Sequence, residues 1–229
     1  MKLADSIRLA IFLERLNRFE ALVDINNRNE LIHIPNPGRM KELLIPGCEI
    51  VLREVNSPNR KTKYDLLGII KNGVHISLDS NAPNKIFMEA LLKKRIYEFN
   101  DVLDIKKEIK IGNSRLDFLL FDKKGKIYIE IKSCTLVENE IALFPDAPTS
   151  RGVRHLMELK EIVKRGDRGA IIFIIQRPDA KIFMPNYKTD PTFSNKLIEV
   201  YNSGVDVFAY DCQVNLPFIE LNKRIRIKL

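Results

Sequence analysis

Two carboxylates and an ammonium group, on Asp117, Glu130 and Lys132, are spaced so that they can meet in one place. They lie in two segments, 115–121 and 126–132, whose alternating pattern and β-forming residues predict two strands. Glu130 and Lys132 are two residues apart, so their side chains project from the same face of a strand. Such a group could bind a divalent cation, because hard cations such as Mg²⁺ use one or two carboxylates together with substrate phosphate.

The residues between the two strands, Asp122-Lys123-Lys124-Gly125, predict a four-residue turn that sets the pairing of the strands. If Phe121 pairs with Lys126, Asp117 lies opposite Glu130. Two facing carboxylates repel each other, and a shared cation would remove this repulsion. A one-residue slip in the turn would separate the two carboxylates. One face of the strand pair is predicted to be wholly apolar, and it consists of Leu116, Phe118, Leu120, Ile127, Ile129 and Ile131.

We expect Asp117 and Glu130 to bind Mg²⁺ or Mn²⁺, with the carbonyl oxygen of Ile131 as a further ligand. Lys132 would stand beside a water molecule and offset the charge that builds on a phosphate. Glu89, on a predicted helix before the strands, is a candidate third carboxylate for the metal and for catalysis. The alternatives are an exposed ion pair of Glu130 with Lys132 or Arg115, which would contribute little, and, for Glu89, an ordinary solvated helix residue.

The elements that position these residues belong to a chain of 229 residues with 45% hydrophobic residues, which is enough for one large or two modest folded domains. The net charge of +8 favours a polyanionic partner such as nucleic acid. Three widely separated cysteines indicate reduced thiols and a cytoplasmic protein. No apolar run reaches membrane-spanning length, so we expect no membrane partner. The oligomeric state is left open, with a homodimer among the alternatives.

Residues 1–82 contain short alternating segments separated by turns, and they predict a five-stranded barrel of the OB type. The predicted strands are 7–16, 19–25, 31–34, 48–55, 65–70 and 74–78, with Asn72-Gly73 as a hairpin turn and 40–44 as a short helix. Five basic residues of this part are predicted to bind DNA phosphates, and they are Arg18, Arg39, Arg60, Lys61 and Lys63. The alternative is ordinary turn chemistry around Pro37-Gly38 and a solvated basic loop at 60–63.

Residues 83–229 follow a turn-rich joint at 80–84 and predict a second, α/β domain with a mixed sheet flanked by helices. The predicted helices are 84–99, with Asn84 as cap, a second from Thr149 or Ser150 to Val163, and 191–202. The run Gly169 to Ile175, GAIIFII, is typical of a strand buried on both faces. The overall prediction is therefore a mixed α/β chain of two domains.

Three more residues of the second domain are predicted to contact nucleic acid. Arg151 and Arg154 lie near the start of a helix, where free amides and the helix dipole favour phosphate. Gln176 follows the buried strand and should emerge at a sheet end, where sites often lie. A basic solvated helix face is the alternative for the two arginines. His155, next to them, is interpreted as a structural histidine rather than a metal ligand.

The spacing Asp-x12-Glu-x-Lys, from Asp117 to Lys132, resembles the active site of the PD-(D/E)xK nuclease superfamily. In that superfamily the Asp and Glu bind divalent metal, the Lys stands beside the attacking water, and a helix glutamate often completes the site. Glu89 occupies a matching place. Longer stretches resemble the sugar fermentation stimulation protein A (SfsA) family, and they are FLERLNRF at 12–19, HIPNPGRM at 33–40, RKTKYDL at 60–66 and ALFPDAPTSRG at 142–152.

The resemblance to the SfsA family implies an N-terminal OB-fold domain, a C-terminal PD-(D/E)xK-like domain and DNA binding without clear sequence preference. Two hypotheses follow. The first is a Mg²⁺-dependent nuclease that cuts phosphodiester bonds with Asp117, Glu130 and Lys132. The second is a non-catalytic DNA-binding regulator of sugar (maltose) metabolism genes. A sugar-binding protein is a third class, since OB barrels bind oligosaccharides, but the chain has no tryptophan to stack on a sugar ring.

Overall fold

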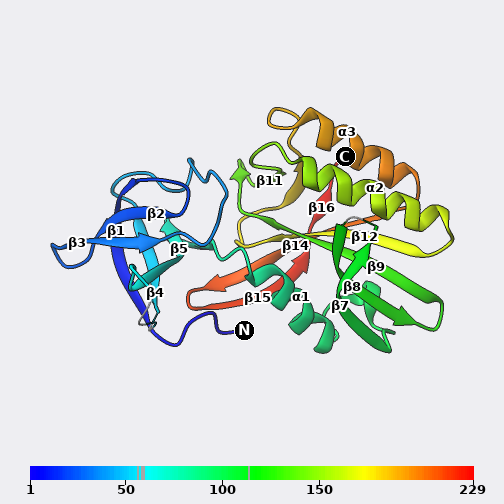
Figure 1. Ribbon diagram of the computed structural model, residues 1–229, viewed down its shortest axis with the longest axis horizontal. Coiled ribbons are helices and arrows are strands. Elements are labelled where there is room, and N and C mark those ends of the chain that lie inside the picture. The colour runs from blue at the N-terminus through cyan, green and yellow to red at the C-terminus, as the bar shows by residue number, and fades with distance from the viewer. Residues whose placement is uncertain (56, 58–59, 113) are drawn as a thin grey trace.

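The computed structural model describes residues 1–55, 57, 60–112 and 114–229. The chain forms a barrel from its first third and a larger α/β part that lies beside it (Figure 1). No helix in these described ranges is long and apolar enough to cross a membrane. This mixed α/β architecture confirms the predicted fold class.

The barrel strands follow the sheet order β3-β2-β1-β4-β5-β6, and a further pairing of β3 with β5 closes the barrel. The strands are β1 (Ile7–Arg15), β2 (Glu20–Asp24), β3 (Asn29–His33), β4 (Glu49–Glu54), β5 (Tyr64–Lys71) and β6 (Val74–Ser77). Every second side chain points inward, and the barrel has a core of its own that includes Phe12, Ile32 and Ile50. The strand order β1-β2-β3-β5-β4 around the barrel confirms the predicted OB-type fold.

The turns of the barrel agree with the sequence in one place and differ in another. Asn72 and Gly73 have φ of 52° and 76°, the conformation that a two-residue hairpin turn requires. The predicted helix at 40–44 is wrong, because this segment makes a single turn in which the Leu44 amide donates to the Met40 carbonyl at 2.9 Å. Met40 has a left-handed φ of 48°, and Pro46 restricts the residue before it, so a helix cannot extend in either direction.

The α/β part is built on a six-stranded mixed sheet with the order β15-β14-β12-β9-β8-β7. Its strands are β7 (Asp104–Ile111), β8 (Ser114–Asp122), β9 (Gly125–Cys134), β12 (Arg168–Ile175), β14 (Asp206–Asn215) and β15 (Phe218–Arg224). The central strands β9, β12 and β14 are parallel, and the outer strands pair antiparallel. A small second sheet contains β10 (Val137–Glu138), β11 (Ile141–Phe144), β13 (Ile182–Pro185) and β16 (Arg226–Ile227).

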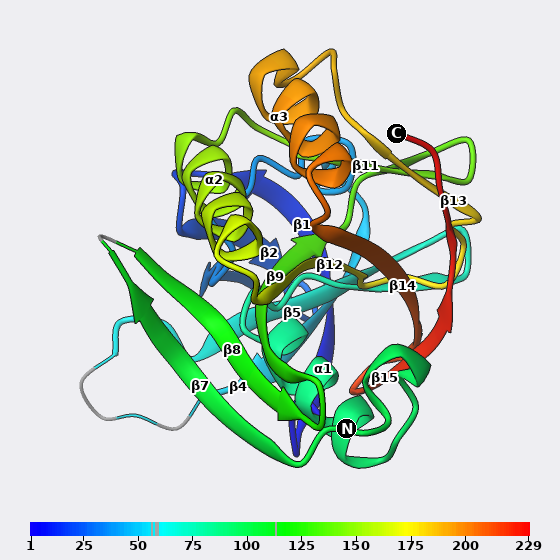
Figure 2. The ribbon, with the colours of Figure 1, turned by 90° about the vertical axis from the view of Figure 1, so that its right-hand side faces the viewer.

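Helices cover both faces of the large sheet. Helix α1 (Ala82–Leu92) packs on one face, and α2 (Ser150–Lys164) and α3 (Pro191–Asn202) pack on the other (Figure 2). Strand β12 divides its side chains between the two layers: Ile172 and Ile174 face the α1 core, whereas Ile171 and Phe173 face the α2–α3 core. Full burial of each such side chain contributes about 1.5–3 kcal/mol. The prediction of a strand buried on both faces is confirmed.

Helix α1 differs from the predicted helix 84–99 at both ends. It begins at Ala82, because Pro83 fits the first turn of a helix, where no amide hydrogen is needed. It ends at Leu92, because Lys94 takes a left-handed φ of 53° and the Arg95 amide returns to the Ala90 carbonyl at 2.8 Å. A separate 3₁₀ turn, η1, covers Tyr97–Phe99. Asn84 is therefore not the cap, and its side chain is available for another contact.

Gln176, at the end of β12, joins the barrel to the α/β part. Its side-chain oxygen accepts from the Ser77 hydroxyl at 3.0 Å, and its amide nitrogen donates to the Ser133 hydroxyl at 2.9 Å. Its backbone carbonyl accepts from the Ser77 amide at 3.0 Å. The side chain is 0% exposed. The structure therefore contradicts the prediction that Gln176 contacts nucleic acid, because it is buried in the junction.

We expect Gln176→Ala to lower the free energy of unfolding by about 1–3 kcal/mol, because it removes the hydrogen-bond partner of the buried Ser77 hydroxyl and of the half-buried Ser133 hydroxyl. Urea unfolding followed by circular dichroism would measure the change. Gln213→Ala is the matched control, since Gln213 is exposed on the neighbouring strand β14, and it should change the free energy by less than about 0.5 kcal/mol. Equal effects of the two substitutions would contradict a junction role for Gln176.

Candidate metal centre

The strand pair that carries the candidate residues has the predicted register. Phe121 pairs with Lys126, although the turn between β8 and β9 needs two residues rather than four, since Asp122 also pairs with Gly125. The described pairing ends at Phe118 and Ile129. Beyond this point a side chain replaces a backbone carbonyl as the hydrogen-bond acceptor: Oδ2 of Asp117 accepts from the Ile131 amide at 2.8 Å.

The apolar face of this strand pair is confirmed except at one residue. Five of the six predicted side chains pack in the α1 core, but Leu116 packs in the α2–α3 core. The neighbouring strand β7 contains Glu108 with a left-handed φ of 54°, between the pairs Lys107–Phe118 and Ile109–Leu116. This irregularity in β7 lies beside Asp117. At the same place the Leu116 side chain points to the α2–α3 face of the sheet instead of the α1 face.

Glu130 lies at the centre of the site and is 3% exposed. Its Oε1 accepts from the Lys132 ammonium at 2.5 Å and from Nδ1 of His155, a residue of α2 that is 2% exposed. Burial alone would raise the pKa of Glu130, but the hydrogen bond from His155 and the charge of Lys132 outweigh it and hold the pKa below its ordinary value. The ion pair with Lys132 is therefore buried, and the alternative of an exposed pair is wrong.

His155 and Arg151 form a second layer behind Glu130. A carboxylate has no hydrogen to give, so Nδ1 of His155 must carry the hydrogen in the contact with Glu130. The other ring nitrogen, Nε2, then accepts from Nε of Arg151 at 3.4 Å. The interpretation of His155 as a structural histidine agrees with these contacts, but its contact with Glu130 was not predicted.

The carboxylate of Asp117 is held by neutral donors rather than by a cation. Its Oδ2 accepts from the Ile131 amide, and its Oδ1 accepts from the side chain of Asn84 on α1 at 2.8 Å. Burial raises the pKa of Asp117, and the negative charge of Glu130 raises it further. Asp117 and Glu130 thus form a pair of carboxylates that repel each other, as the sequence predicts. Asn84 was not predicted as part of the site, because an asparagine at the expected start of a helix was interpreted as its N-terminal cap.

One oxygen of the site has no partner. Oε2 of Glu130 is buried and makes no hydrogen bond within the described structure. A buried carboxylate oxygen left alone is costly, and a divalent cation that it shared with Asp117 would satisfy it. No cluster of three or more metal-binding side chains is found in the described part of the chain. Two carboxylates are nevertheless a usual protein contribution to a Mg²⁺ site, where water and substrate phosphate complete the coordination.

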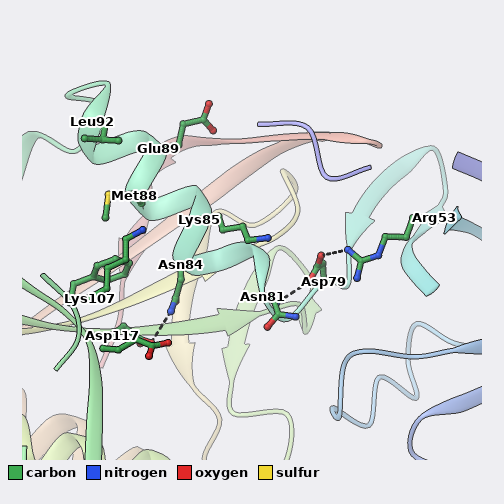
Figure 3. Close-up of a pocket in the computed structure, with 12 residues that line it drawn as sticks. Arg53, Asp79, Asn81, Asn84, Lys85, Met88, Glu89, Leu92, Lys107 and Asp117 are labelled. Carbon is green, nitrogen blue, oxygen red and sulfur yellow. Dashed lines mark hydrogen bonds and ion pairs between the residues drawn. The ribbon is translucent and has the colours of Figure 1, made fainter. Parts of the chain in front are cut away.

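Glu89 does not join this pair. Its carboxylate is 2.9 Å from the amino group of Met1 and 2.5 Å from the Lys93 ammonium. Figure 3 shows Glu89 and Asp117 at opposite ends of one pocket, with the Glu89 carboxylate pointing away. Asn84, one turn earlier on α1, is the helix residue that reaches Asp117. The geometry does not support the prediction of Glu89 as a third ligand or catalytic residue.

The pocket beside Asp117 has a volume of about 700 Å³ and spans both parts of the molecule. Arg53 of β4 and Asp79 form an ion pair of 2.9 Å at its barrel end, and α1 and β7 supply further walls (Figure 3). Lys85 and Lys107 also line it. The carboxylate of Asp117 is therefore reached through an open, partly basic hollow.

Most of the basic residues that the sequence predicts for DNA binding are exposed. Arg18 and Arg39 line a hollow of about 470 Å³ on the barrel, and neither forms an ion pair within the described residues. Lys61 and Lys63 are also exposed, and so is Arg154 on α2. Their contact with nucleic acid stays a prediction.

Arg60 and Arg151 have protein partners. Arg60 donates to Asp65 at 2.5 Å, and the same carboxylate accepts from Arg53 at 3.1 Å. Arg60 therefore has a structural role that the basic loop alone did not indicate. Arg151 is exposed but turned toward His155. Among the described residues, Arg151 is the predicted DNA-binding arginine that donates to His155, the histidine behind Glu130.

Comparison with known proteins agrees with this architecture. A family model described as the SfsA N-terminal OB domain matches residues 13–78, and one described as the sugar fermentation stimulation protein RE domain matches residues 81–217. A sugar fermentation stimulation protein homolog of Clostridium tetani is 44% identical over 100% of both chains, and one of Ruminiclostridium cellulolyticum is 45% identical over 98% of both. The structure of Pyrococcus furiosus SfsA in complex with Ca²⁺ superposes with a TM-score of 0.91 at 35% identity and covers 100% of both chains. The chain belongs to the sugar fermentation stimulation protein A (SfsA) family.

Proposed function

We propose that the protein is a divalent-metal-dependent nuclease that binds DNA and cuts phosphodiester bonds. The observation that carries the proposal is the unpartnered, buried Oε2 of Glu130 beside the second carboxylate of Asp117. The similar protein from Pyrococcus furiosus is described in complex with Ca²⁺, a hard cation of the kind that carboxylate oxygens bind. Mg²⁺ or Mn²⁺ is the metal we assign to the reaction.

The metal would be held by Asp117 and Glu130. Bound there, it would polarise a phosphoryl oxygen and supply a water nucleophile at neutral pH. The Ile131 amide and Asn84 orient Asp117, while His155 holds Oε1 of Glu130 and leaves Oε2 for the cation. The fold thus holds both carboxylates, those of Asp117 and Glu130, in place for the metal through hydrogen bonds to neighbouring groups.

Lys132 has a different part in the reaction. Its ammonium is 2.5 Å from Oε1 of Glu130, and its side chain is 14% exposed. A positive charge held there stabilises negative charge that builds on a phosphate oxygen in the transition state. A lysine held by a metal-binding carboxylate also stays beside the metal without competing for it.

DNA would approach over the basic surface of the barrel. The chain has a net charge of +8, and Arg18, Arg39, Lys61 and Lys63 are exposed. Phosphate contacts of this kind bind DNA without regard to sequence and weaken as salt rises. The family name points to sugar metabolism, and a regulatory role through DNA binding is the alternative to cleavage.

The test is incubation of the protein with plasmid and with single-stranded DNA in Mg²⁺, in Mn²⁺ and in EDTA. We expect cleavage with metal and none with EDTA, and gel electrophoresis would show both. DNA binding in the presence of EDTA should persist, since the basic surface does not need the metal. Binding of DNA with no cleavage in either metal would overturn the nuclease and favour the non-catalytic DNA-binding protein.

A further inference from the structure

One exposed aromatic side chain stands apart from the others. Phe19 precedes β2 in the β1–β2 loop and is 46% exposed. Its ring stacks on the His33 ring at 6.4 Å and 23° between planes, and the Arg18 guanidinium lies 5.4 Å from its centroid. Among the described residues, no other exposed aromatic side chain has both a stacked ring and a guanidinium beside it. A single exposed apolar residue needs no explanation. An exposed ring that is stacked on a second ring and has a guanidinium beside it does need one.

The backbone around Phe19 is held in place. Its amide donates to Oδ1 of Asn17 at 2.8 Å, and its carbonyl accepts from the Ile34 amide at 2.7 Å. Arg15 fixes the same loop by donating to the carbonyls of Asn17 at 3.1 Å and Arg18 at 2.7 Å. The ring is therefore organised before any ligand arrives, so a ligand that stacked on it would lose little affinity to ordering.

The partner ring is fixed as well. Nδ1 of His33 is 3.0 Å from Asp65, which also binds Arg60 and Arg53. His33 ends β3, and Phe19 precedes the strand that pairs with it, so both rings lie at one end of the β2–β3 ribbon. In OB folds the face of the second and third strands and the loop between the first two strands are where oligonucleotides bind.

Arg18, the neighbour of Phe19, lines two hollows of the molecular surface. Arg18 lines the barrel hollow with Arg15 and Arg39, and it also lines a second hollow of about 340 Å³. Ser133 and Thr149 also line that second hollow. Ser133 directly follows Lys132 on β9. A DNA strand that ran from the candidate metal centre through this second hollow would pass Arg18, the residue before Phe19.

We propose that Phe19, backed by His33 and flanked by Arg18, is a stacking platform for an unpaired nucleobase, so the protein binds a single-stranded segment of its DNA substrate. A base inside a duplex has both faces covered by its neighbours, whereas an unpaired base can stack on an aromatic ring. The guanidinium of Arg18 lies over the ring, and a stacking base would displace it from there, so that it could contact the adjoining phosphate. This inference rests on the proposed DNA substrate and adds the class of DNA that is bound.

The chain contains no tryptophan, so a tryptophan at position 19 would be a sole reporter. In Phe19→Trp, we expect oligothymidine added in EDTA to quench tryptophan fluorescence, with saturation at the concentration that saturates binding. Tyr201→Trp is the control, since Tyr201 is 52% exposed near the end of α3, a helix that lies away from the barrel (Figure 1), and the fluorescence of this variant should not change. A Phe19→Trp protein that binds the oligonucleotide with unchanged fluorescence would overturn the platform.

Affinity provides the second arm. We expect Phe19→Ala and Phe19→Leu to weaken oligothymidine binding at least about fivefold, in line with the loss of one stacked base. Phe19→Tyr should retain the affinity, and a duplex of equal length should bind all variants within about twofold. Full affinity in Phe19→Leu, or equal losses for single strand and duplex, would overturn the inference.

The two proposals fail in different ways. Binding and fluorescence are measured in EDTA, so they do not depend on cleavage. If metal-dependent cleavage occurs but Phe19 variants bind single strands as tightly as wild type, only the stacking inference is wrong. If position 19 reports stacking but no metal supports cleavage, only the nuclease is wrong.

Discussion

Glu130→Gln should lower the rate of metal-dependent DNA cleavage by about 10³-fold, the size of effect seen when one preorganised electrostatic group is removed. The substitution keeps the side-chain volume and an oxygen that can accept from His155, but it removes the charge. The unpartnered Oε2 position then holds either an amide nitrogen or a neutral oxygen. Neither is the anionic ligand that a hard cation prefers.

The same variant should separate metal binding from DNA binding. We expect calorimetric titration with Mn²⁺ to show a loss of affinity of at least about tenfold. DNA affinity in EDTA should stay within about twofold, because the exposed basic residues are unchanged. Glu138→Gln is the matched control, since Glu138 is exposed on β10, and it should leave both measurements unchanged. Full cleavage activity in a folded Glu130→Gln protein would contradict the assigned metal centre.

The pairing of β8 with β9 could be predicted because all its determinants are local. The alternation of residues and the turn at 122–125 lie within one short stretch, so the register that brings Asp117 near Glu130 could be predicted from the sequence. The individual barrel strands and the doubly buried β12 were predictable for the same reason, since each depends on a regular local pattern. The ends of α1 were not, because Pro83 favours an earlier start and Lys94 adopts a conformation that is rare for its residue type.

The second layer of the site could not be predicted, because it depends on contacts between distant segments. His155 reaches Glu130 from 25 residues away, across the β9–α2 connection. Gln176 turned out to be buried for a similar reason, since only the docked barrel places Ser77 over it. A polar residue at the end of a sheet can be exposed to solvent or covered by a neighbouring domain. The sequence of the strand itself does not distinguish these two cases. The same limit applies to Arg60, whose carboxylate partner follows from barrel closure at β3 and β5.

Asp65→Asn should cause the largest loss of stability among the changes considered, about 3–5 kcal/mol in the free energy of unfolding. Asp65 is 4% exposed and accepts from Arg60 and Arg53, with His33 at 3.0 Å. A neutral amide removes the charge that pairs with Arg60 and one of the two carboxylates that pair with Arg53, the other being Asp79, where β3 pairs with β5 and closes the barrel. Asp5→Asn is the control, because Asp5 forms an exposed ion pair with Lys2, and it should change the free energy by at most about 1 kcal/mol.

The effect should also depend on pH in a defined direction. Burial would raise the pKa of Asp65, but its hydrogen bonds with Arg60, His33 and Arg53 outweigh burial and hold the pKa below its ordinary value. A carboxylate with a depressed folded-state pKa contributes stability that is fully present above its unfolded pKa of about 3.9 and is lost as the pH falls through the folded value. The difference between wild type and Asp65→Asn in urea unfolding should therefore be constant above about pH 5 and shrink below about pH 4. A difference that grew on acidification would show that the charge of Asp65 is not what holds the barrel closed, and the packing of its neighbours would have to account for the loss.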